Sequence, residues 1–154
     1  MSEPLPDLDI YAAATNPTAQ QRYNELLIEQ FRRNAGKVTG QFATLPVLLL
    51  RTIGAKTGAI RTHPLVYFED GDRYVVVASK AGASANPAWY HNLVANRRAA
   101  VELPTGQCDV EARIPEGDER DDLFQRVVDH FPIYDNYQRR TGRRIPIIVL
   151  ERIG

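Results

Sequence analysis

Short β-prone runs joined by tight turns fill the middle of this chain, and they restrict its fold more than any other feature. The turn at residues 54–58 lies between a run at residues 47–53 and a second run at residues 60–68. A third run follows at residues 73–79, after the hairpin signal Glu69-Asp70-Gly71-Asp72. Strands joined by such short turns pair antiparallel, because a parallel pair needs a crossover of a dozen or more residues.

The second half of the chain continues this pattern with few helices between the strands. Residues 99–103 and 107–114 are predicted strands around a Pro104-Thr105-Gly106 turn, and residues 145–153 form a last one. Only a short helix over residues 87–96 precedes the fourth strand, so a doubly wound parallel sheet fits poorly. We therefore expect an α+β fold, a small β-barrel of about six mostly antiparallel strands with flanking helices.

Two longer amphipathic helices are predicted outside the barrel. The first covers residues 17–34, with Asn16 as the N-cap and Pro17 in the first turn. Its apolar residues recur at helical spacing: Ala19, Tyr23, Leu26, Leu27 and Phe31. The second covers residues 121–131. We expect the first helix to pack its apolar stripe on the domain. The alternative is contact with a membrane surface or a partner, which is disfavoured because the charges of the helix arginines are offset by glutamates.

Length and composition indicate one globular domain. The chain has 154 residues, of which 44% are hydrophobic and 25% are charged, an ordinary globular composition. We expect a tail at residues 1–15 and a single domain over residues 16–154. Nineteen basic residues balance nineteen acidic ones, so no overall field draws in nucleic acid. The dispersed arginine pairs, such as Arg143-Arg144, are expected on a solvated face.

Targeting and metal-binding signals are missing from the sequence. The N-terminus carries acids where a signal peptide needs Lys or Arg, and no apolar run reaches the roughly 20 residues that span a bilayer. We therefore expect a cytoplasmic protein. His63, His91 and His130 are isolated from one another, and the single Cys108 cannot build a cysteine-rich site, so no metal site is expected. The oligomeric state is left open.

A glycine-framed turn offers a site for an anion. Gly54-Ala55-Lys56-Thr57-Gly58 lacks the glycine spacing of a P-loop, but backbone N–H groups in such a turn can form an anion nest. Lys56 adds a point charge and Thr57 a hydroxyl. Arg61 adds a planar fork suited to phosphate or carboxylate. The alternative is an ordinary hairpin turn with solvated basic residues.

Two later segments carry small and aromatic residues that suit a flat ligand. Residues 79–86 are nearly all small, which either lets a planar ligand approach the backbone or makes a flexible connector. Trp89 begins the short helix as a ligand platform or as part of the core. Tyr134 and Tyr137 lie in a predicted loop that a proline interrupts. Their hydroxyls can donate a proton to a ligand, and the alternative is that both rings simply cover the core.

Three blocks of the sequence together resemble the deazaflavin-dependent nitroreductases. In chain order they are GAKTGAIRTHPL, VVVASKAGASANPAWYHNL and FPIYDNYQRRTGRRIPIIVL, and the resemblance covers residues 31–150. Proteins of this family are FMN-binding-like split β-barrels that bind the 8-hydroxy-5-deazaflavin coenzyme F-420. The resemblance implies a reductase that transfers a hydride from the reduced cofactor to quinones, activated enones or nitroaromatics.

The resemblance also implies roles for particular residues. Lys56, Thr57 and Arg61, with the turn backbone at Ala55, would hold the phosphate and the acidic oligoglutamate tail of the cofactor. The other implied cofactor contacts are His63, Pro64, Leu65, Val66, Val77, Ala78, Ser79, Lys80, Ala88, Trp89, Tyr90 and Asn92. Ala55 stands where the family often has Arg or Lys, and Ala81 stands where it often has glycine.

For catalysis, the resemblance implies that Tyr134 faces the substrate. We expect either Tyr134 or an ordered water to donate a proton to the reduced acceptor, and Ser79 to polarise the acceptor oxygen. The expected partner is a small-molecule electron acceptor. Two other hypotheses stay open. One is a deazaflavin carrier or ligand-binding barrel without turnover, and the other is an FMN- or haem-binding protein on the same fold.

Overall fold

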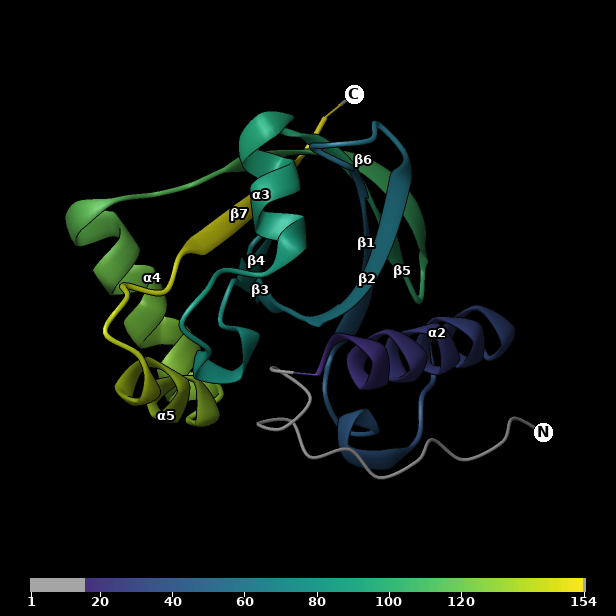
Figure 1. Cartoon of the computed structure of the whole chain (residues 1–154), viewed down its shortest axis with the longest axis horizontal. Coiled ribbons are helices and arrows are strands. Elements are labelled where there is room, and N and C mark those ends of the chain that lie inside the picture. Colours follow the sequence, from purple (N-terminus) through teal and green to yellow (C-terminus); the bar gives the residue numbers. More distant parts are fainter. Residues whose placement is uncertain (1–15, 154) are drawn as a thin grey trace.

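The computed structural model describes residues 16–153 as one curled antiparallel sheet with four helices around it (Figure 1). The tail expected at residues 1–15 lies outside the described residues. The strands are β1 (Val47–Ile53), β2 (Ile60–Val66), β3 (Phe68–Asp70), β4 (Arg73–Val77), β5 (Arg98–Leu103), β6 (Gly106–Arg113) and β7 (Ile147–Arg152). Their order in the sheet is β2-β1-β5-β6-β7-β4-β3, and every neighbouring pair is antiparallel. The predicted α+β barrel is thus confirmed.

One residue closes this sheet. The run predicted as a single strand over residues 60–68 divides at Tyr67 into β2 and β3, which gives seven strands rather than about six. These two strands lie at opposite ends of the strand order, so the sheet must curl until its two edges approach each other. The Tyr67 N–H donates to the carbonyl of Pro46 at 3.1 Å, and the Tyr67 ring packs edge-on against Tyr74.

The helices agree with the sequence patterns except near Pro132. They are α2 (Pro17–Arg33), α3 (Ala88–Ala95), α4 (Gly117–His130) and α5 (Ile133–Arg140), with short 3-10 turns η1 (Gly40–Phe42) and η2 (Lys80–Gly82). Asn16 caps α2 as expected, since its side chain accepts from the Ala19 N–H at 3.2 Å. The helix α4 begins before the predicted residue 121. The prediction of a loop over the two tyrosines is wrong, because proline is compatible with a helix start and Pro132 leads directly into α5.

The continuous apolar run of β1 is explained by burial on both of its faces. Leu48 and Leu50 point into the barrel, where α3 contributes Trp89 and Leu93 to the same cluster. Val47 and Leu49 point the other way and pack with Phe31 of α2. A strand buried on both faces loses the apolar–polar alternation of a half-exposed strand. On the other side of the sheet, α4 and α5 cover β4 and β7 (Figure 1).

The apolar stripe of α2 is used for packing inside the domain. Tyr23, Leu27 and Phe31 are each only 3% exposed. Arg32 adds a two-pronged ion pair across to β5, with its Nε and Nη2 lying 3.1 and 2.7 Å from the carboxylate oxygens of Glu102. The expected packing of this helix on the domain is therefore confirmed, and its stripe is not presented to a membrane surface. Within residues 16–153 there is no helix with the length and apolarity needed to cross a bilayer.

The chain leaves α2 through a glycine that touches the β5–β6 turn. Gly36 has a φ of 88°, a conformation that L side chains rarely adopt. A Cβ atom on this residue would lie 2.5 Å from Cγ of Pro104. Both features require glycine, and together they fix the end of α2 against the barrel.

We expect Gly36→Ala to lower the free energy of unfolding by about 2–4 kcal/mol, because the left-handed backbone strain adds to a steric clash. Urea unfolding measures this loss. Gly71→Ala is the matched control, since Gly71 also has a positive φ of 64° but no heavy atom lies within 4 Å of its Cβ position. It should cost only about 1 kcal/mol. Equal losses for the two variants would contradict close packing at Gly36.

Candidate functional site

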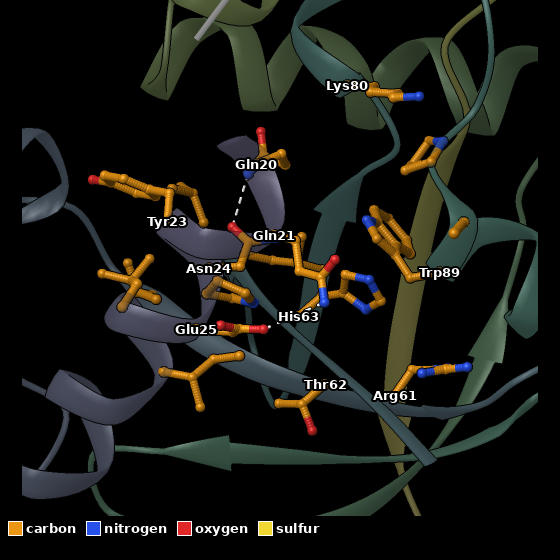
Figure 2. Close-up of a pocket in the computed structure, with 18 of the residues that line it drawn as sticks. Gln20, Gln21, Tyr23, Asn24, Glu25, Arg61, Thr62, His63, Lys80 and Trp89 are labelled. Carbon is orange, nitrogen blue, oxygen red and sulfur yellow. Dashed lines mark hydrogen bonds between the residues drawn. The ribbon is translucent and has the colours of Figure 1, made fainter. Parts of the chain in front are cut away.

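A cavity of about 710 Å³ lies between α2 and β2 and is bordered by η2 and the start of α3 (Figure 2). Cavities of roughly 300–1,000 Å³ are typical of cofactor and small-molecule sites. Three of its walls come from different elements: the strand β2, the helix α2 and the strained turn η2. Their side chains differ in chemistry.

The strand wall comes from β2, and it is apolar with one cation. Pro64, Leu65 and Val66 line the cavity, and Arg61 lies at its border. Because β2 ends the strand order, proline is tolerated there and one side of its backbone has no strand partner within the described residues. Backbone N–H and C=O groups on that side are thus available to a ligand.

His63 lies on the same wall, and one of its ring nitrogens has no partner. Its Nδ1 atom is buried, and no hydrogen bond to it is found within residues 16–153. Burial lowers the pKa of His63, and the positive charge of Arg61 lowers it further. The imidazole is therefore neutral near pH 7. A buried polar atom without a partner is uncommon in proteins and marks a place where a ligand group can bind.

The helix wall comes from α2, and it is mixed in polarity. Its polar residues are Gln20, Gln21, Asn24 and Glu25 (Figure 2), and its other lining residues are Pro17, Tyr23, Leu27 and Ile28. The side-chain amide of Gln20 donates to Asn24 Oδ1 at 2.8 Å, and that of Gln21 donates to Glu25 Oε1 at 3.3 Å. These polar residues of α2 are not among the site residues expected from the sequence, where only the apolar stripe of the helix carried an expectation. The cluster of uncharged amides at positions 20, 21 and 24 is the signal that could have revealed this wall.

The third wall contains the turn η2, whose backbone is strained. Lys80 and Ala81, which both line the cavity, have φ values of 46° and 53°. Non-glycine residues in this left-handed region cost about 1–2 kcal/mol each. Glycine would adopt such a φ at position 81 without this cost. Lys80 is exposed and lies across the cavity from Arg61 (Figure 2).

The glycine-framed turn between β1 and β2 lies outside the cavity lining. Ala55, Lys56 and Thr57 are exposed, and the Thr57 hydroxyl accepts from the Ala59 N–H within the turn at 3.2 Å. The turn leads directly into β2, which carries Arg61 to the cavity border. A role for the turn in binding an anionic tail therefore stays a prediction.

The Asn92 side chain of α3 holds this turn through hydrogen bonds. The side chain is buried, its Oδ1 accepts from the Ala55 N–H at 3.0 Å, and its Nδ2 donates to Thr52 Oγ1 at 3.0 Å. The structure thus places Asn92 behind the turn and not in the cavity lining.

The structure brings about half of the predicted cofactor contacts together. Those that line the cavity are Arg61, His63, Pro64, Leu65, Val66, Lys80, Ala88 and Trp89. Those outside its lining are Ala55, Lys56, Thr57, Val77, Ala78, Ser79, Tyr90 and Asn92. Val77, Ala78 and Ser79 are buried at the end of β4. Trp89 is 4% exposed in the barrel core and also lines the cavity, so its role as a ligand platform stays a prediction.

The two tyrosines of α5 are placed differently. Both tyrosines pack on the cluster around Val75 and Val77, but of the two only Tyr137 also lines the cavity. Their rings meet edge-on at 5.6 Å. Burial raises the pKa of Tyr134, so its phenol stays protonated at neutral pH.

Two further observations concern the metal-ligand residue types and the arginine pair at residues 143–144. Within residues 16–153, no three His, Cys, Asp or Glu side chains lie together in a way that could hold a metal ion. The expectation of a solvated Arg143 is wrong, because this side chain reaches back to the segment after β4. Its Nη2 donates to the carbonyl of Ser79 at 2.6 Å. The neighbouring Arg144 is exposed, as expected.

Comparison with known proteins identifies the family. The model of the F420H(2)-dependent quinone reductase family matches residues 24–152. This chain belongs to that family. An F420H(2)-dependent quinone reductase of Mycobacterium tuberculosis is 44% identical over 110 residues, which are 70% of this chain and 74% of the relative.

Solved structures agree with this assignment. An F420-H2 dependent reductase, FDR-A, has a TM-score of 0.64 and 38% identity, over 69% of this chain and 94% of that one. A haem storage protein from Vibrio cholerae, HutZ, has a TM-score of 0.54 and 14% identity over 82% of this chain and 88% of its own, which shows a shared fold only. The expected split β-barrel and its deazaflavin cofactor, coenzyme F-420, are thereby confirmed for this family member.

The depressed pKa of His63 predicts how stability depends on pH. The unfolded histidine has a pKa near 6.5, so between that pH and the lower folded value the unfolded chain binds the extra proton. Stability should therefore be full above about pH 7 and fall as the pH drops toward 5. One such proton gives a slope of at most about 1.4 kcal/mol per pH unit.

Urea unfolding at a series of pH values measures this slope. His63→Gln should flatten it between pH 7 and 5, whereas His91→Gln, which changes an exposed histidine on α3, should keep it. An unchanged slope in His63→Gln would show that the imidazole is not held neutral by the fold.

Proposed function

We propose that this reductase binds reduced coenzyme F-420 in the cavity between α2 and β2 and reduces a quinone there. The proposal rests on one observation: the same cavity is lined by apolar and aromatic side chains and by cations. An apolar strand face and a buried indole suit a flat ring, and the cations Arg61 and Lys80 at the cavity border suit an anionic ligand. Activated enones and nitroaromatics are further predicted acceptors.

The residues present fit this cofactor. Pro64, Leu65 and Val66 would lie against the ring, and the unpartnered Nδ1 of His63 would meet one of its polar atoms. Arg61, with Lys56 on the adjoining turn, would hold the phosphate and acidic tail, since a guanidinium and an ammonium both form charge-assisted hydrogen bonds with such groups. Asn92 supports this arrangement by fixing the turn backbone at Ala55.

The chemistry supplied by the bound cofactor is donation of a hydride to the acceptor. The protein must then exclude water, orient the acceptor and supply a proton. The α2 wall closes the cavity opposite β2, and its amides at Gln20, Gln21 and Asn24 can hydrogen-bond to carbonyl oxygens of a quinone. An acceptor that gains a hydride carries negative charge on oxygen, and a nearby O–H stabilises that charge by donating its proton.

We propose Tyr137 as the donor of this proton, because it is the α5 tyrosine that lines the cavity. Tyr134, to which the family resemblance assigned the substrate-facing role, packs on the same core cluster as Tyr137 but does not line the cavity. Ser79 is buried and does not line the cavity, so a role in polarising the acceptor oxygen stays a prediction.

Tyr137→Phe keeps the ring and removes only the hydroxyl. We expect the turnover number to fall by roughly 10- to 1,000-fold, while the dissociation constant of the cofactor changes only a few-fold. Steady-state kinetics with a quinone measures the first quantity and cofactor fluorescence the second. Tyr134→Phe is the matched variant and should keep most of the activity. The opposite ranking would return the role to Tyr134, and full activity in both would leave water as the donor.

The proposed function is tested by mixing the purified protein with reduced coenzyme F-420 and a quinone and following cofactor oxidation. Catalytic oxidation, with many turnovers per protein molecule, is the expected result. Binding without any turnover across quinone, enone and nitroaromatic acceptors would support the carrier hypothesis instead. Tight binding of FMN or haem in preference to the deazaflavin would overturn the cofactor assignment.

A further inference from the structure

The segment that joins β4 to α3, residues 78–86, adopts an unusual backbone next to the cavity. It carries Lys80 and Ala81 into the lining with positive φ values at both. Gly82 continues the left-handed run with a φ of 79°. Three consecutive residues in this region persist only where surrounding contacts hold them. The question is which contacts those are.

Arg143 supplies most of them from a distant part of the chain. Its Nη1 donates to the carbonyl of Ala78 at 3.1 Å and to Asn86 Oδ1 at 2.8 Å. Its Nη2 donates to the carbonyl of Ser79 at 2.6 Å, and its Nε to the carbonyl of Ala83 at 2.9 Å. One guanidinium thus bonds to both ends and the middle of the segment. Arg143 itself does not line the cavity.

The backbone of Arg143 is itself held in place. Gln138 of α5 donates through Nε2 to the carbonyl of Arg143 at 2.7 Å, and its Oε1 accepts from the Ile145 N–H at 3.0 Å. The buried Arg120 of α4 donates to the same Gln138 Oε1 at 3.0 Å. The backbone from which the Arg143 side chain extends is therefore held by α5, and α4 supports the same Gln138 side chain.

A second contact shapes the segment from the same side. A Cβ atom on Gly82 would lie 2.6 Å from the carbonyl oxygen of Tyr137 and 2.8 Å from Cβ of Arg140. The left-handed turn is thus pressed against α5 while Arg143 bonds to the residues on either side of it. Lys80, at the start of the turn, is among the residues that line the cavity.

We propose that Arg143 is a positioning residue for the cofactor site. By holding residues 78–86, it fixes where the Lys80 ammonium stands at the cavity border. Affinity for the anionic cofactor then depends on a side chain that never touches it. This inference rests on the proposed function, because it takes coenzyme F-420 as the ligand.

The test compares cofactor binding in Arg143→Ala, Arg143→Lys and the control Arg144→Ala. Arg144 is exposed and ion-paired with Asp121, away from the segment. We expect the dissociation constant of coenzyme F-420 to rise about tenfold or more in Arg143→Ala. It should rise less in Arg143→Lys, because an ammonium cannot reach four dispersed acceptors, and stay at the wild-type value in Arg144→Ala. Added methylguanidinium should restore part of the affinity of Arg143→Ala.

A double-mutant cycle with Lys80→Ala separates positioning from general destabilisation. If Arg143 acts through Lys80, Lys80→Ala should weaken binding in the wild-type background and have little further effect in Arg143→Ala. Hydrogen exchange of the ligand-free variants gives an independent measurement. Exchange should increase in residues 78–86 of Arg143→Ala and stay unchanged in the turn at residues 54–58.

The outcomes separate this inference from the function on which it rests. A wild-type protein that binds no deazaflavin overturns both. Wild-type binding that is retained in Arg143→Ala overturns the positioning role alone, as do additive effects in the cycle. If Arg143→Ala does not fold, Arg143→Lys decides: unchanged affinity with unchanged exchange at residues 78–86 would contradict the proposal.

Discussion

The sheet of this protein closes because a single residue, Tyr67, joins its two outermost strands. Only one residue separates the end of β2 from the start of β3. The two edges of the sheet must therefore lie close together, and the sheet cannot stay flat. The closure creates the barrel interior that Trp89 and Leu93 of α3 fill. The strands β2 and β3, at the two ends of the strand order, each keep one side without a strand partner, and β2 forms the apolar wall of the cavity.

The position of the cavity follows from how α2 is attached to the closed sheet. Packing of Phe31 on β1, the ion pair of Arg32 with Glu102 and the close contact of Gly36 with Pro104 hold one end of the helix on the barrel. The first part of α2 then lies over β2 with its amide side chains toward the strand. The shape of the cavity therefore depends on packing contacts made by residues outside its lining.

The sequence predicts the strands of this fold well because their signals are local. Turn residues and β-prone runs locate β1, β2, β4, β5, β6 and β7 within a few residues. Two errors are local as well: the break at Tyr67 divides a predicted strand, and Pro132 begins a helix where a loop was expected. The apolar run of β1 also predicts burial on both faces, although not which helix covers each face.

The site is predicted less completely, since it depends on contacts between residues far apart in the chain. Arg61, His63 and Trp89 line the cavity as the family resemblance implies. The amide cluster of α2 at positions 20, 21 and 24 is a local signal that was not used, whereas the role of Arg143 could not be predicted, because solvation of an arginine pair is the usual outcome. Spacing cannot show that Arg143 bonds to a segment about 60 residues earlier.

The central claim is that the cavity between α2 and β2 holds the deazaflavin, and Trp89 offers the most direct measurement of it. This is the only tryptophan of the chain, and it forms part of the cavity lining. Titration with coenzyme F-420 should quench its emission saturably, because a conjugated ring then lies beside the indole. The midpoint should equal the dissociation constant obtained from the fluorescence of the cofactor itself. Tryptophan emission that stays constant while the cofactor signal shows saturation would place the cofactor elsewhere and contradict this account.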